Sequence, residues 1–490
     1  MTSAPPDCSD HGPVVDVVIV GAGLSGIGAA RHLQRHCPQL RFILLESRQS
    51  MGGTWDLFRY PGIRSDSDMH TLGYNFRPWV ARKAIADGPA ILDYIRTTAA
   101  EGGIDKLIRY DHRVIAANWD SGSALWTLEI AHPTGGGSSK LQTRFLYMCS
   151  GYYSYASGYN PPLPGEERFA GRLVHPQFWP QDLDYAGKRV VVVGSGATAV
   201  TLVPELAKHA AQVTMLQRTP GYVVSRPSVD RLALWLDRHL PSNWAYALTR
   251  WKNVLLGMLF FRLSQRRPAM IRRYLLDLAA KELGSGYDMR HFSPDYKPWD
   301  QRLCAVPDSD LFTSLRNGKA RVVTDTIADI TAHGITLASG KTLDADVIVK
   351  ATGLELEIFG GMRICVDGKP VDVAQAVAYK GMMLSGVPNL FMAFGYTNAS
   401  WTLKADLTAG WVCRALNHLH TQGQRSIVAK WTGASQTTPF MALQSGYVAR
   451  AQHLMPRQGM HSPWRVHQNY LADVLAIRFG RLDDGVLEFH

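Results

Sequence analysis

Residues 16–26 read DVVIVGAGLSG, an apolar run that leads directly into three glycines. Asp16 to Val20 predicts a buried strand, and the glycine loop opens a helical pattern that ends near Cys37. A second apolar strand follows at Arg41 to Leu45. The succession of strand, glycine turn, helix and strand is typical of a βαβ unit that binds a dinucleotide.

Each glycine of this loop has a physical role in such a unit. Gly21 permits the tight turn, Gly23 lets the backbone approach a pyrophosphate, and Gly26 lets the helix pack on the strand. The N-terminus of the helix attracts the phosphate charge. Glu46 lies 20 residues after Gly26, where a carboxylate binds the diol of a ribose.

The same pattern recurs near the middle of the chain. Arg189 to Val193 predicts a strand, GSGATA (Gly194 to Ala199) the turn, and Gln212 to Leu216 the next strand. This strand ends with Arg218 and Thr219 instead of an acid, and Arg218 suits a 2′-phosphate because guanidinium binds phosphate bidentately. We therefore expect the first loop to bind FAD and the second to bind NADPH, with Gly194, Gly196 and Thr198 as contacts of the second.

Length and composition suit a large globular enzyme. The 490 residues predict two or three domains, and 46% hydrophobic with 19% charged residues indicates packed cores. The six cysteines form no C-x-x-C pair, so we predict neither a metal site nor a dithiol redox centre, and we expect a reducing, cytoplasmic setting. We read the first residues as a short loose tail without a signal peptide, and no apolar stretch is long enough to span a membrane.

The positive charge is concentrated in one segment. Of the net charge of +11, Arg226 to Arg290 contributes +7, from twelve Lys and Arg against five Asp and Glu. This segment also has long helical patterns, and it carries no nucleic-acid recognition motif. We therefore expect no nucleic acid partner, and we consider a weak peripheral association with anionic membranes through the arginines beside Leu255 to Phe261.

Two dinucleotide sites leave three classes of flavoenzyme open: disulfide reductases, simple flavin reductases and monooxygenases. The first class needs a paired-cysteine motif, which the sequence lacks. Between the two glycine loops stands FAGRLVHPQFWP, Phe169 to Pro180, which resembles the F-x-G-x-x-x-H-x-x-x-W-P signature of type I Baeyer-Villiger monooxygenases. The stretches MGGTW, RYPGIRSD, QRTP and ATG agree with the same family.

The resemblance implies an α/β fold with two Rossmann-like domains, one for FAD and one for NADPH, and a helical insertion in the NADPH domain. It implies an FAD-binding domain at 1–165 and 386–490, an NADPH-binding domain at 166–225 and 319–385, and the insertion at 226–318. It also implies that ketones are converted to esters or lactones through a C4a-peroxyflavin formed with dioxygen, and that sulfides or thioamides are oxidised.

The family's motifs also assign site residues. The resemblance implies that Arg302 is the cation beside the flavin, that Asp66 positions it, and that Gly53, Thr54 and Trp55 contact FAD. The alternatives are that Asp66 caps a helix and that Arg302 is an exposed ion-pair partner. Gln301 departs from the family, whose members commonly carry lysine there. His175 of the signature is expected at the domain linker, and Trp401 is a candidate for the substrate pocket or a buried structural residue.

The sequence therefore predicts an FAD- and NADPH-dependent Baeyer-Villiger monooxygenase that acts on a small ketone or a sulfur-containing substrate with dioxygen. Two alternatives remain at this point. One is a flavin-containing monooxygenase that acts on nitrogen or sulfur, and the other is a flavin redox sensor or scaffold without catalysis. The sequence predicts neither the oligomeric state nor the physiological substrate.

Overall fold

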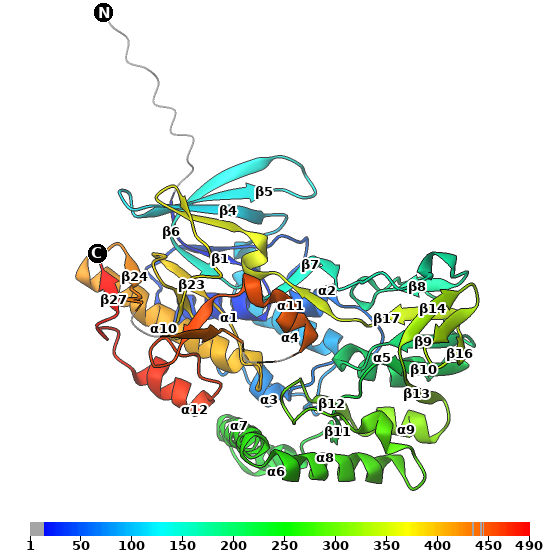
Figure 1. Ribbon diagram of the computed structural model, residues 1–490. Coiled ribbons are helices and arrows are strands. Elements are labelled where there is room, and N and C mark those ends of the chain that lie inside the picture. The colour runs from blue at the N-terminus through cyan, green and yellow to red at the C-terminus, as the bar shows by residue number, and fades with distance from the viewer. Residues whose placement is uncertain (1–13, 434–435, 442, 444) are drawn as a thin grey trace, which may run out of the picture.

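The computed structural model describes residues 14–433, 436–441, 443 and 445–490, so the expected N-terminal tail lies mostly outside the described residues. Two sheets organise these residues, and each contains one of the two glycine loops (Figure 1). The mixed α/β architecture with two dinucleotide-binding units confirms the predicted fold class.

The first sheet has nine strands in the order β20-β19-β4-β5-β6-β1-β2-β3, with β23 paired to β6. At its centre β1 pairs in parallel with β2 and with β6, as a βαβ unit requires. The strands are β1 (Val15–Val20), β2 (Phe42–Leu45), β3 (Ile108–Arg109), β4 (Arg113–Asp120), β5 (Leu125–Ala131), β6 (Ser138–Met148), β19 (Arg363–Val366), β20 (Lys369–Pro370) and β23 (Leu390–Met392).

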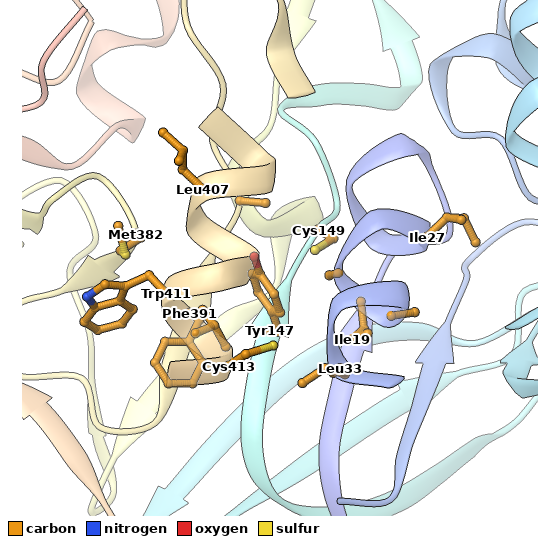
Figure 2. Packing of buried hydrophobic residues seen from close by; sticks show 14 of the residues in the cluster. Ile19, Ile27, Leu33, Tyr147, Cys149, Met382, Phe391, Leu407, Trp411 and Cys413 are labelled. Atoms are coloured by element: carbon orange, nitrogen blue, oxygen red, sulfur yellow. The ribbon is translucent and has the colours of Figure 1, made fainter. Parts of the chain in front are cut away.

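Two helices from opposite ends of the chain cover one face of this sheet. Helix α1 (Leu24–His36) follows the first glycine loop, and α10 (Trp401–Gln422) packs beside it. Figure 2 shows Trp411 and Cys413 of α10 beside Tyr147 of β6, with Leu33 of α1 in the same buried cluster. The N-terminal and C-terminal parts of the chain therefore share one core. Also near this sheet lie α2 (Thr54–Leu57), α3 (Met69–Leu72) and α4 (Gly88–Glu101).

The second sheet is entirely parallel and has the order β13-β10-β9-β17-β8. Its central strands β9 and β17 are runs of buried valine and isoleucine, as is usual for strands of a parallel sheet that are covered on both faces. The elements are β8 (Arg172–Val174), β9 (Arg189–Val193), α5 (Ala197–Leu206), β10 (Gln212–Gln217), β13 (Ala320–Thr324) and β17 (Val347–Lys350), and β14 (Ile327–Thr331), β15 (Gly334–Leu337) and β16 (Thr342–Asp344) form a small sheet beside them.

A helical segment leaves the second sheet after β10. It contains α6 (Arg231–His239), α7 (Ser242–Arg266) and α8 (Pro268–Leu283), and it lies between β11 (Val223–Arg226) and β12 (Cys304–Pro307), which pair with each other. Helix α9 (Asp310–Arg316) follows and packs back on α5. In Figure 1 the three long helices form the face of the molecule opposite to β4 and β5.

The strand pairings correct one expected boundary. Strands β19 and β20 fall within 319–385, the range expected for the second part of the NADPH-binding domain, yet β19 pairs with β4 of the first sheet. The chain therefore returns to the first sheet before residue 385. The stretch after β17 consists of very short strands without a glycine loop or a long apolar run, so the sequence pattern did not indicate the return. The remaining division of the chain stays a proposal.

Candidate active site

One cavity of about 520 Å³ lies between the first glycine loop and the start of α5, the helix that follows the second loop. Residues of the first loop line it together with Ala197 and Thr198, which follow the second loop. Arg302 and Asp66 also line this cavity. The fold thus brings together residues from four distant parts of the sequence around a single space.

The first loop forms a cradle that only glycine permits. Gly21 has φ +103°, and a Cβ there would lie 2.6 Å from the carbonyl oxygen of Cys149. A Cβ on Gly26 would lie 1.9 Å from the carbonyl oxygen of Gly21, so this glycine allows α1 to close on the turn. Gly23 stands at the N-cap of α1, where the first backbone N–H groups have no helical partner.

Glu46 directly follows β2 beside this cradle. Its carboxylate accepts hydrogen bonds from the backbone N–H of Ala22 at 2.8 Å and of Arg48 at 3.1 Å. The side chain is buried but lines the cavity, and burial raises the pKa of its carboxyl group above the ordinary value. A rigid acceptor at the end of the second strand suits the diol of an adenosine ribose.

The segment Gly52–Leu57 closes the cradle from the other side. Gly52 and Gly53 both have positive φ, and the Cα of Gly23 would lie 3.1 Å from a Cβ on Gly53. Thr54 and Trp55, at the start of α2, line the cavity. Asp56, which sequence reasoning missed, is buried and pairs with three arginines, Arg48 at 2.7 Å, Arg59 at 3.4 Å and Arg96 at 3.3 Å.

The second loop has a similar but more open geometry. Gly194 has φ +138°, and a Cβ there would lie 2.3 Å from the carbonyl oxygen of Ala351. Gly196 has open space around it and precedes α5, whose residue Thr198 lines the cavity. Arg218 and Thr219 are exposed just after β10, and the hydroxyl of Ser195 donates to the carbonyl oxygen of Thr219 at 3.1 Å. Arg218 is therefore available to an anionic ligand beside this loop.

Arg302 and Asp66 form an ion pair in which Nη2 lies 2.6 Å from Oδ2. Asp68, not Asp66, caps the following helix α3, because its carboxylate accepts from the backbone N–H of Thr71 at 3.0 Å. The alternative role considered for Asp66 is thus filled by its neighbour. The Asp66 charge holds the pKa of Arg302 well above its usual value, so this cation is permanent.

The pair lies where two cavities meet. A smaller cavity of about 140 Å³ also has Asp66 and Arg302 in its wall. The surfaces that the two side chains leave exposed, 38% for Arg302 and 29% for Asp66, face these cavities. The wall of the smaller cavity combines apolar residues, among them Val254, Met258, Phe260, Phe261, Trp299 and Leu303, with about as many polar ones, among them Asp68, Asn253 and Asn398.

A group of tyrosines around Arg302 was missed by sequence reasoning. Tyr152 and Tyr153 line the main cavity, and their hydroxyl groups lie 3.1 Å apart. Tyr447 also contacts the Arg302 guanidinium, and burial raises the pKa of this tyrosine to about 12. The signal in the sequence is the run Tyr152-Tyr153-Ser154-Tyr155 directly after the glycine that follows β6.

The two signature candidates lie at different places. His175 directly follows β8 of the second sheet; its Nδ1 accepts from the backbone N–H of Gln177 at 3.2 Å, and its ring lies against Gly158. Burial lowers the pKa of this imidazole. Trp401 lines the main cavity and donates from Nε1 to Ser25 Oγ at 2.7 Å, so it lies beside the first glycine loop and outside the smaller cavity. Within the described ranges, no cluster of His, Cys, Asp and Glu is arranged to hold a metal ion.

Comparison with known proteins identifies the family. Residues 85–358 match the description "Flavin-binding monooxygenase-like", and residues 19–82 match an NAD(P)-binding Rossmann-like domain. The chain belongs to the flavin-binding monooxygenase-like family. Another member, FAD-containing monooxygenase EthA of Mycobacterium tuberculosis, is 54% identical over 97% of both chains. The probable FAD-binding monooxygenase AlmA of Acinetobacter baylyi is 48% identical over 97% of this chain and 96% of its own.

Solved structures agree with this family membership at the level of the fold. The structure of OTEMO in complex with FAD and NADP superimposes with a TM-score of 0.74 at 20% identity, and covers 98% of this chain and all of its own. An oxidised steroid monooxygenase bound to NADP gives a TM-score of 0.70 at 24% identity over 85% of this chain and 88% of its own. At this identity the likeness concerns the fold alone.

The residues present fit the cofactors of such a family. The first loop offers unpaired backbone N–H groups, no side chain where a pyrophosphate would approach, and the acceptor Glu46. The second loop offers the same kind of backbone N–H groups and free space, and the exposed Arg218 takes the place that Glu46 has in the first unit. These donor sets suit FAD at the first loop and NADPH at the second.

Proposed function

We propose that this chain is an FAD- and NADPH-dependent monooxygenase of the Baeyer-Villiger type. The overall reaction consumes a ketone, dioxygen, NADPH and a proton and yields an ester or lactone, NADP⁺ and water. The observation that carries the proposal is the ion pair of Arg302 and Asp66, placed where the main cavity meets the smaller one. Family membership supplies the chemistry, and the geometry indicates which side chains serve it.

Bound FAD would take reducing equivalents from NADPH and activate dioxygen. The loop from Gly21 to Gly26 and the Glu46 carboxylate would hold its adenosine diphosphate half, and Arg218 would hold the 2′-phosphate of NADPH. These groups bind and orient, and they move no proton in the reaction.

Arg302 would supply a fixed positive charge where negative charge develops on oxygen during attack on a carbonyl carbon. A preorganised donor in a cavity that excludes water stabilises such a transition state by about 3 to 4 kcal/mol. Asp66 would aim the guanidinium through their contact at 2.6 Å. Because the pKa of Arg302 is raised, it stays a donor throughout and does not act as a general acid.

The same site suits oxidation at sulfur, the second activity that the family resemblance of the sequence implies. Sulfur oxidation produces no tetrahedral carbonyl adduct, so it should depend less on Arg302 than ketone oxidation does. No described helix is long and apolar enough to cross a bilayer. A weak peripheral association with anionic membranes is a separate proposal.

The test is turnover of the purified protein with NADPH and isotopically labelled dioxygen. Ketones and thioethers are supplied in parallel, and products are identified by mass spectrometry. Ester that contains one labelled oxygen supports the proposal. Sulfoxide without ester supports the alternative flavin-containing monooxygenase, and NADPH binding without any oxygenated product supports the redox sensor or scaffold.

A further inference from the structure

The polar and apolar sides of helix α7 are exchanged with respect to an ordinary surface helix. Its inward side carries polar groups: Arg250 is buried and donates from Nη1 to the carbonyl oxygens of His70 at 2.7 Å and Gly73 at 2.9 Å. Its outward side carries large apolar side chains. A helix normally buries its apolar stripe and exposes its polar one, so the outward side of α7 is suited to a partner that is itself apolar.

The outward apolar residues form one stripe, which we call the α7 face: Trp244, Leu248, Trp251, Leu255 and Leu259. They follow one another at intervals of four, three, four and four residues, which keeps them on one side of a helix. All five are exposed, Trp244 by 68% and Leu259 by 54%. The stripe runs about 22 Å along the helix, since each residue adds about 1.5 Å.

Neighbouring elements extend this apolar surface. Helix α6 exposes Leu232 and Trp235 and packs beside α7. On the other side, the ring of Trp251 lies 5.6 Å from that of Tyr470, which begins α12 (Tyr470–Asp473). From α12 onward the chain exposes Leu471, Leu475 and Phe479 at intervals of four residues. An apolar surface drawn from three elements is larger than soluble proteins usually leave open to water.

Positive charge continues the stripe at its C-terminal end. Arg262 and Arg266 follow Leu259 at intervals of three and four residues, and both are exposed. Within the described part of the chain, the basic residues of this segment that form ion pairs are Lys252, Arg290, Arg302 and Arg316, and neither Arg262 nor Arg266 has a carboxylate partner. A second copy of the chain would bring the same excess of arginine, whereas anionic lipid headgroups would neutralise it.

The opposite side of α7 forms part of the smaller cavity. Val254, Gly257 and Phe261 line it, at positions about half a helical turn away from the α7 face. One helix, about 10 Å thick, therefore separates the outward apolar surface from the cavity that reaches Arg302. A partner that covers the α7 face lies within one helix diameter of the candidate substrate site.

We propose that the α7 face, with the apolar residues of α6 and the C-terminal segment beside it, binds the surface of an anionic phospholipid bilayer. We propose further that the smaller cavity takes apolar ketones or thioethers dissolved in that bilayer, which rests on the monooxygenase function proposed above. The helix would lie in the interface with its apolar stripe below the headgroups and Arg262 and Arg266 among the phosphates.

The binding half is tested by flotation of the full-length holoprotein with vesicles of phosphatidylcholine and phosphatidylglycerol at low salt. Leu255→Gln with Leu259→Gln should lower the bound fraction at least tenfold, because two apolar anchors are lost. Arg262→Gln with Arg266→Gln should lower it by about fivefold for each charge, and added salt should do the same. The matched controls, Leu173→Gln with Leu454→Gln and Arg109→Gln with Arg172→Gln, change exposed residues on other elements and should bind normally.

Three outcomes would overturn the binding half. The wild-type protein could fail to float with the anionic vesicles, or both sets of variants could float equally well. Alternatively, sedimentation could show a dimer that the α7 variants dissociate while no preparation floats, which would assign the α7 face to a second copy of the chain. Flotation needs no catalysis, so its result stands whether or not the protein oxygenates ketones.

The delivery half is tested by comparing two ketones, one short and water-soluble and one long-chain and dissolved in the same vesicles. The α7 variants should keep the rate with the soluble ketone and lose at least tenfold with the vesicle-bound one. Equal rates of wild type and variants with the vesicle-bound ketone refute delivery through this surface. Absence of product from both ketones in the wild type refutes the proposed function instead.

Discussion

The ion pair between Asp66 and Arg302 joins a turn of the first glycine-loop unit to the end of the helical segment. The two groups lie 2.6 Å apart, and both face the cavities. Asp66 is available for this contact because the Asp68 carboxylate, and not that of Asp66, accepts the hydrogen bond from the backbone N–H of Thr71 at the start of α3. The placement of the proposed catalytic cation Arg302 therefore depends on two nearby acids of one turn, of which Asp66 binds the arginine and Asp68 caps the helix.

Replacing Arg302 by alanine should lower the rate of ketone oxygenation at least a hundredfold, since loss of a preorganised cation costs about 3 to 4 kcal/mol at the transition state. NADPH oxidation should continue and release hydrogen peroxide. Asp66→Ala should reduce oxygenation less, because the arginine remains but is less well aimed. Stopped-flow absorbance with product analysis measures each step, and Arg290→Ala, an exposed arginine paired with Asp288, is the control. Native ester yield per NADPH in Arg302→Ala would falsify the assignment.

Arg218→Ala should erase most of the preference for NADPH over NADH. Loss of a charge-assisted hydrogen bond of about 1.5 to 3 kcal/mol corresponds to roughly a ten- to hundredfold weaker affinity for NADPH. Affinity for NADH should change little. Steady-state kinetics with NADPH and with NADH measure the preference as the ratio of the two kcat/KM values. The control is Arg172→Ala on β8, an edge strand of the same sheet. An unchanged preference for NADPH in Arg218→Ala would show that another group binds the 2′-phosphate.

Two glycines of the first loop should respond differently to alanine. In Gly26→Ala the new Cβ would lie 1.9 Å from the Gly21 carbonyl oxygen, so the protein should lose about 1 to 3 kcal/mol of stability or fail to fold. In Gly23→Ala the nearest atom is 3.5 Å away, so the flavin-free protein should keep its stability. FAD affinity should still fall by about tenfold, because the methyl group stands where the pyrophosphate approaches. Thermal unfolding measures the loss of stability, and flavin fluorescence measures the loss of FAD affinity. Normal FAD affinity in Gly23→Ala would contradict the proposal that the pyrophosphate approaches the backbone at Gly23.

The buried carboxyl group of Glu46 should give the flavin-free protein a characteristic pH dependence. Its pKa is raised by burial, so between about pH 4.3, the ordinary value, and the raised value the folded state binds more protons than the unfolded state. The free energy of unfolding should therefore fall as pH rises through this window. Glu46→Gln should flatten this part of the profile, measured by urea denaturation, whereas Glu167→Gln at an exposed site should not. Superimposable profiles for wild type and Glu46→Gln would rule the effect out.

Gly158 and His175 should be energetically coupled. A Cβ on Gly158 would lie 2.0 Å from Cε1 of the imidazole, so Gly158→Ala should destabilise the protein by about 1 to 3 kcal/mol. The same change should cost much less in a His175→Ala background, where the ring is absent. Urea denaturation of the four proteins gives the coupling free energy. Additive effects would show that the ring can move aside, and that contact with Gly158 does not hold His175 in place.

The sequence was most informative where a local rule governs the structure. The runs ending at Val20 and Val193 were predicted as strands, and the structure places strands at Val15–Val20 and Arg189–Val193. Glycine spacing and the residue after the second strand were sufficient to propose which loop holds which cofactor. Both signals are short-range, because the turn, the helix start and the strand end lie within about thirty residues.

Long-range features were much less accessible. Strand β19 has four residues and lies far from β4 in the sequence, so no periodicity indicated that the two strands pair. The contact of Tyr447 with Arg302 is of the same kind. The apolar character of Leu255 to Phe261 was visible in the sequence, but its exposure was not, because apolar residues are normally expected inside.

The order in which the first sheet is assembled has a consequence for synthesis on the ribosome. Strand β6 needs β23 as a neighbour, and α1 is covered by α10, so the unit that begins at Val15 is complete only after Gln422 has left the exit tunnel. Until then the nascent chain carries an unfinished sheet with exposed apolar surface, which favours aggregation and chaperone binding. We therefore expect expression to improve when chaperones are co-produced, and we expect fragments that end before α10 to be insoluble.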